Sequence, residues 1–244
     1  MHYSMRTLAL LGLLALSGAT GCFKLNRGAP VPRQYVLSAG RLQASGPPRI
    51  AGDTAGASIG VRRLRIEPYL DTPLLVVRKG AREITFSEFQ RWAEPLTTGI
   101  NGAVARYLSG RAPVRTVEVA PWPPKERYDY VIQLHVLRFE GEQPDGLGAT
   151  AGGVHLLADW EIVRQDDGAV LAHGTTDYRK GGWRAGDYEG LVALLDEGLV
   201  ALSDALAAKI GELAARPPGS DSLTRRPPTT RPVTPSPANA RTAR

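Results

Sequence analysis

Cys22 is the only cysteine of the 244-residue chain, and its surroundings point to a chemical modification of its thiol. The sequence Ala19-Thr20-Gly21 precedes it, after the apolar stretch Leu8–Leu16 and the basic residue Arg6. A membrane-spanning helix needs about 20 apolar residues, so this stretch is too short to span a bilayer. A basic start, a short apolar run and small residues before a break are typical of a secretory signal.

In a bacterial lipobox, the cleaved peptide bond precedes a cysteine whose thiol takes the lipid. Residues 19–22 have this layout, with alanine where leucine is commoner. We therefore predict a lipoprotein with signal peptide 1–21 and lipid attachment, including palmitate, at Cys22. The alternative is an ordinary signal peptide that is cleaved after Gly18 or Ala19.

Three histidines of the mature chain are the next candidates for chemistry. His135, His155 and His173 lie in or near predicted strands, with no cysteine or carboxylate cluster at the spacing of metal ligands. We expect half-exposed strand histidines and no metal site. Two nearby strands could still bring His135 and His155 together, which leaves open a zinc site, a proton relay or a small hydrolase.

Other catalytic patterns are missing from the sequence. There is no G-x-S-x-G elbow, H-E-x-x-H motif or phosphate-binding loop. The glycines of residues 146–152 miss the dinucleotide fingerprint by one residue. Glu140 and Glu142 share a strand face, and we interpret them as a solvated edge rather than an acid–base pair. The sequence thus predicts no catalytic residues, no cofactor and no enzymatic activity.

The basic charge of the chain is confined to its C-terminal end. The formal net charge is +6, but six arginines against Asp221 give residues 216–244 a charge of +5. Arg6 of the signal supplies the remaining charge, so residues 22–215 are neutral. This distribution argues against nucleic-acid binding. Residues 216–244 are rich in proline, threonine, serine and arginine, which predicts a disordered tail.

The positioning elements follow from hydrophobic periodicity. We predict strands at 35–37, 58–66, 74–78, 83–86, 114–119, 128–140, 153–164 and 169–178. Asp166-Asp167-Gly168 is typical of a hairpin turn. A helix that begins with Ser87 as N-cap and contains Phe89, Trp92 and Leu96 is expected to bend or break at Pro95.

The longest predicted element is a helix that starts near Asp187 and carries leucines at three- and four-residue steps up to Leu213. Its apolar stripe is expected to pack on a sheet, with an oligomer seam as the alternative. We predict an α/β single-domain sandwich of a mixed β-sheet and at least two helices over residues 35–215. Residues 22–34 are predicted to be a linker after the lipid anchor.

Several aromatic residues are spaced through the predicted domain, often beside turns, and they could line a groove or pack in the core. They are Tyr69, Trp92, Trp122, Tyr130, Phe139, Trp160 and Trp183.

Short motifs occur in an order typical of one protein family. They are Tyr35-Val36-Leu37, Ile59-Gly60-Val61, Pro68-Tyr69-Leu70-Asp71, Arg91-Trp92-Ala93-Glu94-Pro95-Leu96, Pro121-Trp122, Asp129-Tyr130, Arg138-Phe139-Glu140 and Ala158-Asp159-Trp160. With the closing leucine helix, the chain resembles the ABC-type transport auxiliary lipoproteins, a family that includes the outer-membrane lipoprotein of the paraquat-inducible system.

This resemblance implies a lipid-anchored, non-catalytic accessory protein. It implies work beside an MCE-domain protein and an inner-membrane ABC permease and ATPase, in moving lipids or other hydrophobic molecules between the two membranes. Tyr69, Leu70, Arg91 and Trp92 are its candidate interface residues, and fold maintenance is the alternative role for them. A homo-oligomer is a further expectation for a subunit that works beside ring-shaped partners.

Phe23 bears on the membrane that holds the anchor. In enterobacterial sorting, an aspartate after the lipidated cysteine retains lipoproteins at the inner membrane, so Phe23 favours the periplasmic face of the outer membrane. The alternative function is an envelope-spacing lipoprotein whose basic tail contacts peptidoglycan.

Overall fold

A computed structural model describes residues 31–37, 56–111, 113–144 and 150–215. Signal peptide 1–21, Cys22 and tail 216–244 lie outside the described residues. Within them the order is β1 (Arg33–Tyr35), β2 (Ala57–Val61), β3 (Arg65–Ile66), the 3₁₀ turn η2 (Pro68–Leu70), β4 (Leu74–Lys79), β5 (Glu83–Trp92), α2 (Leu96–Ser109), β6 (Val114–Val119), β7 (Tyr130–Gln143), β8 (Ala151–Val163), β9 (Val170–Arg184) and α3 (Tyr188–Ala214).

One long strand, β7, organises a mixed sheet of nine strands in the described part of the chain. Along one edge of β7, the strands β2, β3 and β4 pair with it in parallel, one after the other. On its other edge β8 pairs antiparallel, and β9 follows β8. Strand β6 extends the sheet beyond β2, and β5 followed by β1 extends it beyond β4.

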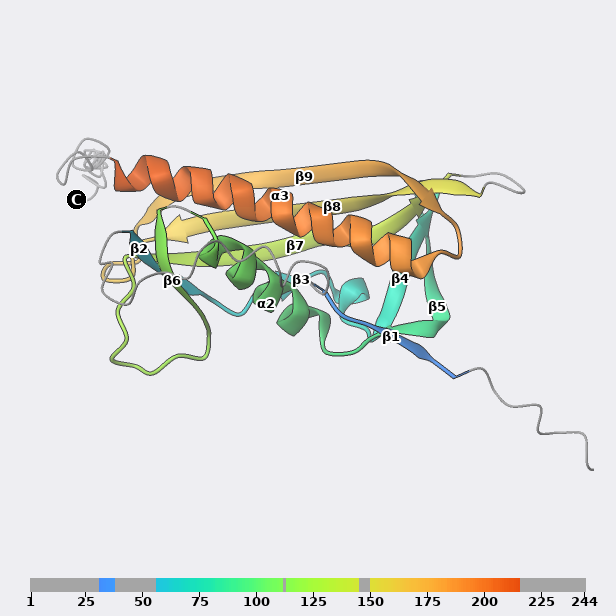
Figure 1. The fold of residues 1–244 in the computed structure, drawn as a ribbon, viewed down its shortest axis with the longest axis horizontal. Helices are drawn as coiled ribbons and strands as arrows, with labels where there is room; N and C mark the ends of the chain where they lie inside the picture. Colours follow the sequence, from blue (N-terminus) through green and yellow to red (C-terminus); the bar gives the residue numbers. More distant parts are fainter. Residues whose placement is uncertain (1–30, 38–55, 112, 145–149, 216–244) are drawn as a thin grey trace, which may run out of the picture.

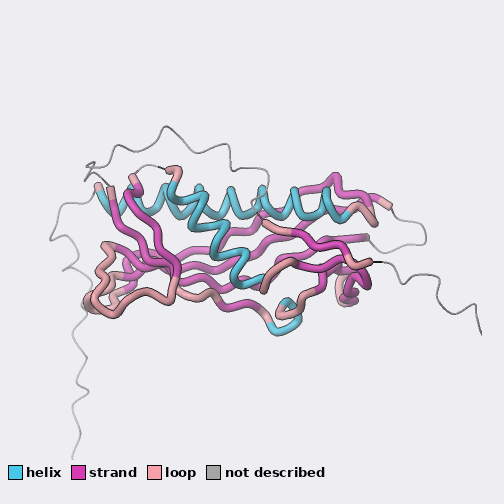
Figure 2. Tube along the Cα trace, turned by 60° about the horizontal axis from the view of Figure 1, so that its bottom comes forward, coloured by secondary structure: helices cyan, strands magenta, loops and turns pink. Residues whose placement is uncertain are grey.

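The two helices lie over one face of the sheet (Figure 2). Helix α3 contacts β7, β8 and β9, and α2 contacts β6 and α3. The Asp187 carboxylate accepts a hydrogen bond of 3.0 Å from the backbone N–H of Gly190, so it caps the first turn of α3. The α/β sandwich with a long C-terminal helix is therefore confirmed.

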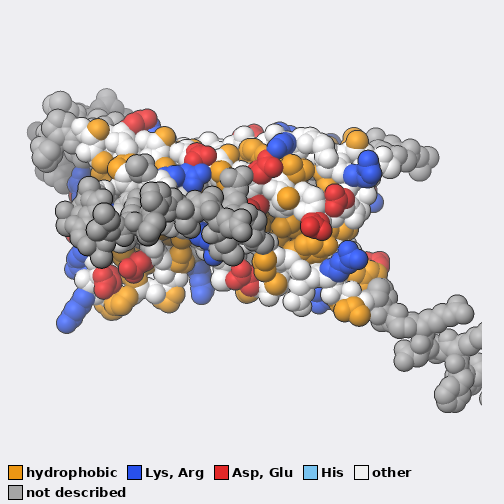
Figure 3. Space-filling model, in the orientation of Figure 1, with side chains coloured by type: hydrophobic (Ala, Val, Ile, Leu, Met, Phe, Trp, Pro, Cys, Tyr) orange, Lys and Arg blue, Asp and Glu red, His pale blue; other side chains and the backbone are white. Residues whose placement is uncertain are grey.

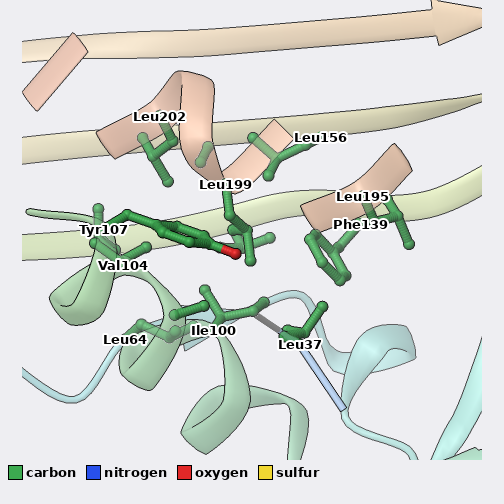
Figure 4. Packing of buried hydrophobic residues seen from close by; sticks show 14 of the residues in the cluster. Leu37, Leu64, Ile100, Val104, Tyr107, Phe139, Leu156, Leu195, Leu199 and Leu202 are labelled. Atoms are coloured by element: carbon green, nitrogen blue, oxygen red, sulfur yellow. The ribbon is translucent and has the colours of Figure 1, made fainter. Parts of the chain in front are cut away.

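The core lies between α3, α2 and the strands. Leu199 and Leu202 of α3 point toward α2, which carries Ile100 and Val104, whereas Leu195 lies beside Phe139 of β7 (Figure 4). The leucine stripe of α3 thus packs within the chain. Helix and sheet approach closely at Gly198, where a Cβ atom would come within 2.9 Å of the Tyr178 ring. The absence of a side chain at this position lets α3 lie directly on β8 and β9.

The predicted helix from Ser87 was wrong in its first part, because residues 87–92 belong to strand β5. Pairing with β4 on one side and β1 on the other satisfies the backbone of β5, and this tertiary pairing overrides the local helical spacing. Pro95 stands at the N-cap of α2 rather than inside a helix. A proline also disfavours helical backbone at the preceding residue, which fits a helix that begins after it.

The other predicted elements are largely confirmed. The 74–78 and 83–86 segments form the expected antiparallel hairpin, and the Asp166-Asp167-Gly168 turn joins β8 to β9. The predicted strand 58–66 is divided into β2 and β3, each of which pairs with β7.

The molecule is elongated, and the described chain enters and leaves it at opposite ends (Figure 1). Strand β1 enters at the end where β4, β5 and the start of α3 lie. The C-terminus of α3 lies at the other end. Because α3 has 27 residues, these ends are separated by at least its length of about 40 Å. The fold therefore places strand β1 and residue 215, which precedes the predicted tail, at opposite ends of the molecule.

Candidate functional site

The predicted interface residues Tyr69 and Leu70 form the 3₁₀ turn η2. Leu70 is fully buried in the core, whereas Tyr69 is partly buried. The Tyr69 hydroxyl lies 2.8 Å from Oε2 of Glu140 and 3.1 Å from the carbonyl oxygen of Leu137. Both oxygens are acceptors, and the hydroxyl is the donor in each contact. Burial, followed by the hydrogen bond and charge of Glu140, raises the pKa of Tyr69 to about 12.

Glu140 is a carboxylate with no solvent exposure, so the expectation of a solvated edge at this position was wrong. Arg78 of β4 donates to it through Nε at 2.5 Å and through Nη2 at 3.4 Å. Arg138 lies 3.7 Å away, and the Arg78 guanidinium also lies 5.8 Å from the centre of the Tyr69 ring. A buried charge requires such partners. Here the strands β4 and β7 and the turn η2 supply them.

His155 of β8 lies beside this group and is also buried, which contradicts the expectation of a half-exposed histidine. Its Nδ1 lies 3.2 Å from Oε1 of Glu142, and its Nε2 lies 2.8 Å from Oδ1 of Asp177. Both ring nitrogens therefore have carboxylate partners of the same chain, and the buried ring offers neither nitrogen to solvent.

These polar side chains lie on the face of the sheet opposite α3. In the β7–β8 pairing, Phe139 is opposite Leu156 and Glu140 is opposite His155. Leu156 packs under Gly198 of α3, and successive residues of a strand point to opposite faces. Glu140 and His155 therefore point away from the helix, and we call the cluster of Tyr69, Arg78, Arg138, Glu140, Glu142, His155, Asp177 and Arg179 the polar network.

The second histidine of the hydrolase hypothesis lies elsewhere. His135 is opposite Asp159 in the β7–β8 register and pairs with Glu67 at 3.1 Å. It is five positions along β7 from Glu140, the residue opposite His155, so the sheet does not bring the two histidines together. Across the described ranges, no three histidine, cysteine or carboxylate side chains are placed to hold a metal ion.

Of the other two predicted interface residues, Trp92 lies in the core and Arg91 lies on the surface. Trp92 ends β5 and is buried, with its ring centre 5.9 Å from that of Phe139. Arg91 is exposed beside it. An interface role for these four residues stays a prediction. Because Leu70 and Trp92 are buried, only Tyr69 and Arg91 offer atoms to a partner.

A groove that sequence reasoning missed lies between β5 and the start of α3. It has a volume of about 410 Å³ and is lined by residues that include Lys79, Phe86, Phe89, Trp183 and Tyr188. Phe86 and Phe89 are exposed although they are large and apolar. The helical spacing of Phe89 and Trp92 concealed this feature, because it placed both residues on one buried face.

Comparison with known proteins gives a family model and a fold. The model of the ABC-type transport auxiliary lipoprotein component matches residues 35–207. A crystal structure of a Xanthomonas campestris protein of family DUF330 superposes with a TM-score of 0.59 and 18% identity, covering 75% of this chain and 98% of that one. A second structure, of an uncharacterised protein, has a TM-score of 0.52 and 16% identity over 74% and 99% of the two chains.

No curated protein matches the sequence. Both structural matches support the fold of the described residues. Among these residues, no helix is long and apolar enough to cross a membrane.

Proposed function

The chain belongs to the family of ABC-type transport auxiliary lipoprotein components, and on this premise we propose that it is a lipid-anchored, non-catalytic accessory component of an MCE-type transport system. Its partners would be an MCE-domain protein and an inner-membrane ABC permease and ATPase. The cargo would be lipids or other hydrophobic molecules that move between the two membranes. Acyl chains on Cys22 would hold it at the periplasmic face of the outer membrane.

The observation that carries this proposal is the extent of the family match, which runs from Tyr35 to Ala207 and so includes nearly all the described fold. The charged groups are consistent with a structural role. Glu140 and His155 are buried and bonded on every side by groups of the same chain. A polar network of this kind fixes the register of neighbouring elements rather than offering free groups to a substrate.

The partners can be tested by purifying the native acylated protein from solubilised envelope and identifying co-purified proteins by mass spectrometry. Cys22→Ala is the matched control, since it removes the predicted lipid attachment at a residue that lies outside the described fold. We expect an MCE-domain protein and transporter subunits in the first sample and fewer in the control. Recovery of the acylated protein without any transporter subunit would contradict the proposal.

An envelope-spacing role is the second candidate, and one structural observation favours it. Helix α3 ends at Ala214, at the end of the molecule opposite β1 (Figure 1). Residues 216–244, with their six arginines, therefore begin at least about 40 Å from the entry of β1, the length of a 27-residue helix. This position suits contact with an anionic polymer such as peptidoglycan, away from the anchoring membrane.

A further inference from the structure

Exposed large hydrophobic side chains gather on two paired strands. The described chain has five of them, and four lie on or beside β1 and β5: Val31 (84% exposed), Val36 (47%), Phe86 (47%) and Phe89 (37%). The fifth, Val170, begins β9 at the opposite end of the molecule. Hydrophobic side chains are visible at the point where the described chain begins (Figure 3). Grouped exposed apolar residues usually mark a contact surface.

We propose that these four residues form a membrane-contact surface that lies against the lipid headgroups of the bilayer holding the protein's own acyl chains. We call it the β1–β5 surface. The inference builds on the lipid anchor of the proposed function and adds the orientation of the folded body. In this orientation β1, β5 and the start of α3 face the bilayer, and the C-terminus of α3 points away from it.

The length of the chain before β1 supports a bilayer as the occupant. Eleven residues, from Cys22 to Pro32, separate the predicted lipid attachment from Arg33, the first residue of β1. Even when fully extended, they span at most about 40 Å. Strand β1 therefore stays within about 40 Å of the membrane whenever Cys22 is acylated, and the surface beside it is the part of the fold attached most directly to the anchor.

Strand pairing fixes the surface to the rest of the fold. In the parallel register, Arg33 is opposite Gln90 and Tyr35 is opposite Trp92. The backbone N–H of Ala93 also donates to the carbonyl oxygen of Tyr35 at 2.9 Å. Because Trp92 is buried in the core, a membrane contact made by β1 and β5 would orient the whole domain.

Exposed arginines lie beside these side chains. Arg33 and Arg91 are exposed on β1 and β5, and Arg82 is exposed in the turn between β4 and β5. The exposed carboxylates of Glu83, Glu88 and Glu94 lie in the same region. Basic residues are attracted to an anionic membrane surface, so these arginines can contact lipid headgroups.

The four apolar side chains need not bind lipid strongly. A short tether makes the contact intramolecular, with an effective concentration in the millimolar range or above. A surface too weak to bind vesicles from solution is therefore sufficient once the acyl chains are inserted. We therefore expect the contact to depend on acylation.

A polarity-sensitive fluorophore on a single cysteine tests the surface. Since Cys22 is the only natural cysteine and its thiol would be acylated, Phe89→Cys provides one free thiol for labelling. Val170→Cys is the matched control, because Val170 is also an exposed apolar strand residue and lies at the far end. Both full-length acylated proteins are reconstituted into vesicles of phosphatidylethanolamine and phosphatidylglycerol, with or without brominated lipid.

We expect the Phe89→Cys probe to show a blue shift in vesicles and a loss of emission with brominated lipid, and the Val170→Cys probe to show neither. Phe86→Cys should repeat the first result. Equal responses at the two ends would overturn the proposal. A blue shift without quenching by brominated lipid would also overturn it, because it would indicate that protein, such as a second copy, covers the surface.

Mass spectrometry of the same samples separates this inference from the proposed function. If Cys22 is acylated and the Phe89→Cys probe stays in water, the orientation is wrong while the anchor stands. If Cys22 carries no lipid, the anchor and the membrane-contact surface both fail. Neither vesicle result involves the transport partners, which the co-purification experiment tests independently.

Discussion

Nε of Arg78 lies 2.5 Å from Oε1 of Glu140, and this ion pair joins β4 to the middle strand of the sheet at a carboxylate without solvent exposure. Tyr69 donates to the other carboxylate oxygen from the turn that precedes β4. One buried charge thus joins the neighbouring segments η2 and β4 to the distant strand β7. The loss of either partner would leave an unpaired charge or polar group inside the fold.

We expect Glu140→Gln to destabilise the protein by about 3 kcal/mol, because removing one partner of a buried ion pair leaves the other without compensation. Urea unfolding followed by circular dichroism measures the change. The double variant Arg78→Met with Glu140→Leu is the control and should lose much less, since no buried charge remains. Equal losses in the single and double variants would show that packing rather than charge dominates here.

The His155–Asp177 hydrogen bond should make stability depend on acid pH. Burial alone would raise the pKa of Asp177, but the hydrogen bond and charge of His155, with Arg179, lower it below its usual value of 3.8. A lowered folded-state pKa adds stability above the unfolded-state pKa, and this stability is lost as the pH falls through the folded-state value. Glu142 and Arg138 are the other charged groups beside this pair.

We expect His155→Leu to flatten that dependence, because the variant lacks the group that most lowers the pKa of Asp177 and retains only Arg179. The free energy of unfolding, measured in urea from about pH 5 to about pH 2, should fall less steeply than in the wild type. His135→Leu is the control, since His135 pairs with Glu67 elsewhere on the sheet. If His155→Leu left the pH dependence of the unfolding free energy unchanged and His135→Leu reduced it, the result would contradict its assignment to the His155–Asp177 pair.

Variants of Trp92 and Arg91 should distinguish a role in fold stability from a role in partner contact. Trp92→Ala removes a buried indole that packs on Phe139, so we expect a loss of about 3–5 kcal/mol in urea unfolding. Arg91→Ala changes an exposed side chain and should alter stability by no more than about 0.5 kcal/mol. If Arg91 contacts a transport partner, Arg91→Ala lowers co-purification at unchanged stability. Unchanged co-purification would remove it from the interface.

Deletion of residues 216–244 distinguishes the two proposed functions. A docking protein whose contacts lie on the folded body should retain its partners without this segment, whereas an envelope tether should lose its contact with peptidoglycan. Co-purification and peptidoglycan co-sedimentation of the full and shortened acylated proteins measure the two outcomes. Loss of the transport partners on deletion would place their contact in the tail and contradict docking by the body.

Local sequence patterns predicted most helices and strands, because the spacing of apolar residues within one element depends only on that element. The leucine spacing gave α3, and the Asp166-Asp167-Gly168 turn gave the β8–β9 hairpin. The same reasoning failed at residues 87–92, where the spacing of Phe89 and Trp92 is helical but pairing with β4 and β1 makes a strand. The interface roles of Tyr69 and Arg91, and the acylation of Cys22, stay predictions.

The sequence by itself determined the order of the elements, the neutral body, the basic end and the family motifs, because these depend on composition and on spacing along the chain. Only the tertiary structure decided which side chains meet. Arg78 and Glu140 are 62 residues apart, and His155 and Asp177 are 22 apart, so their contacts depend on strand pairing. Pairing also decided burial: it enclosed Glu140 and His155, whose polarity suggested exposure, and left Phe86 and Phe89 exposed on the surface of the fold.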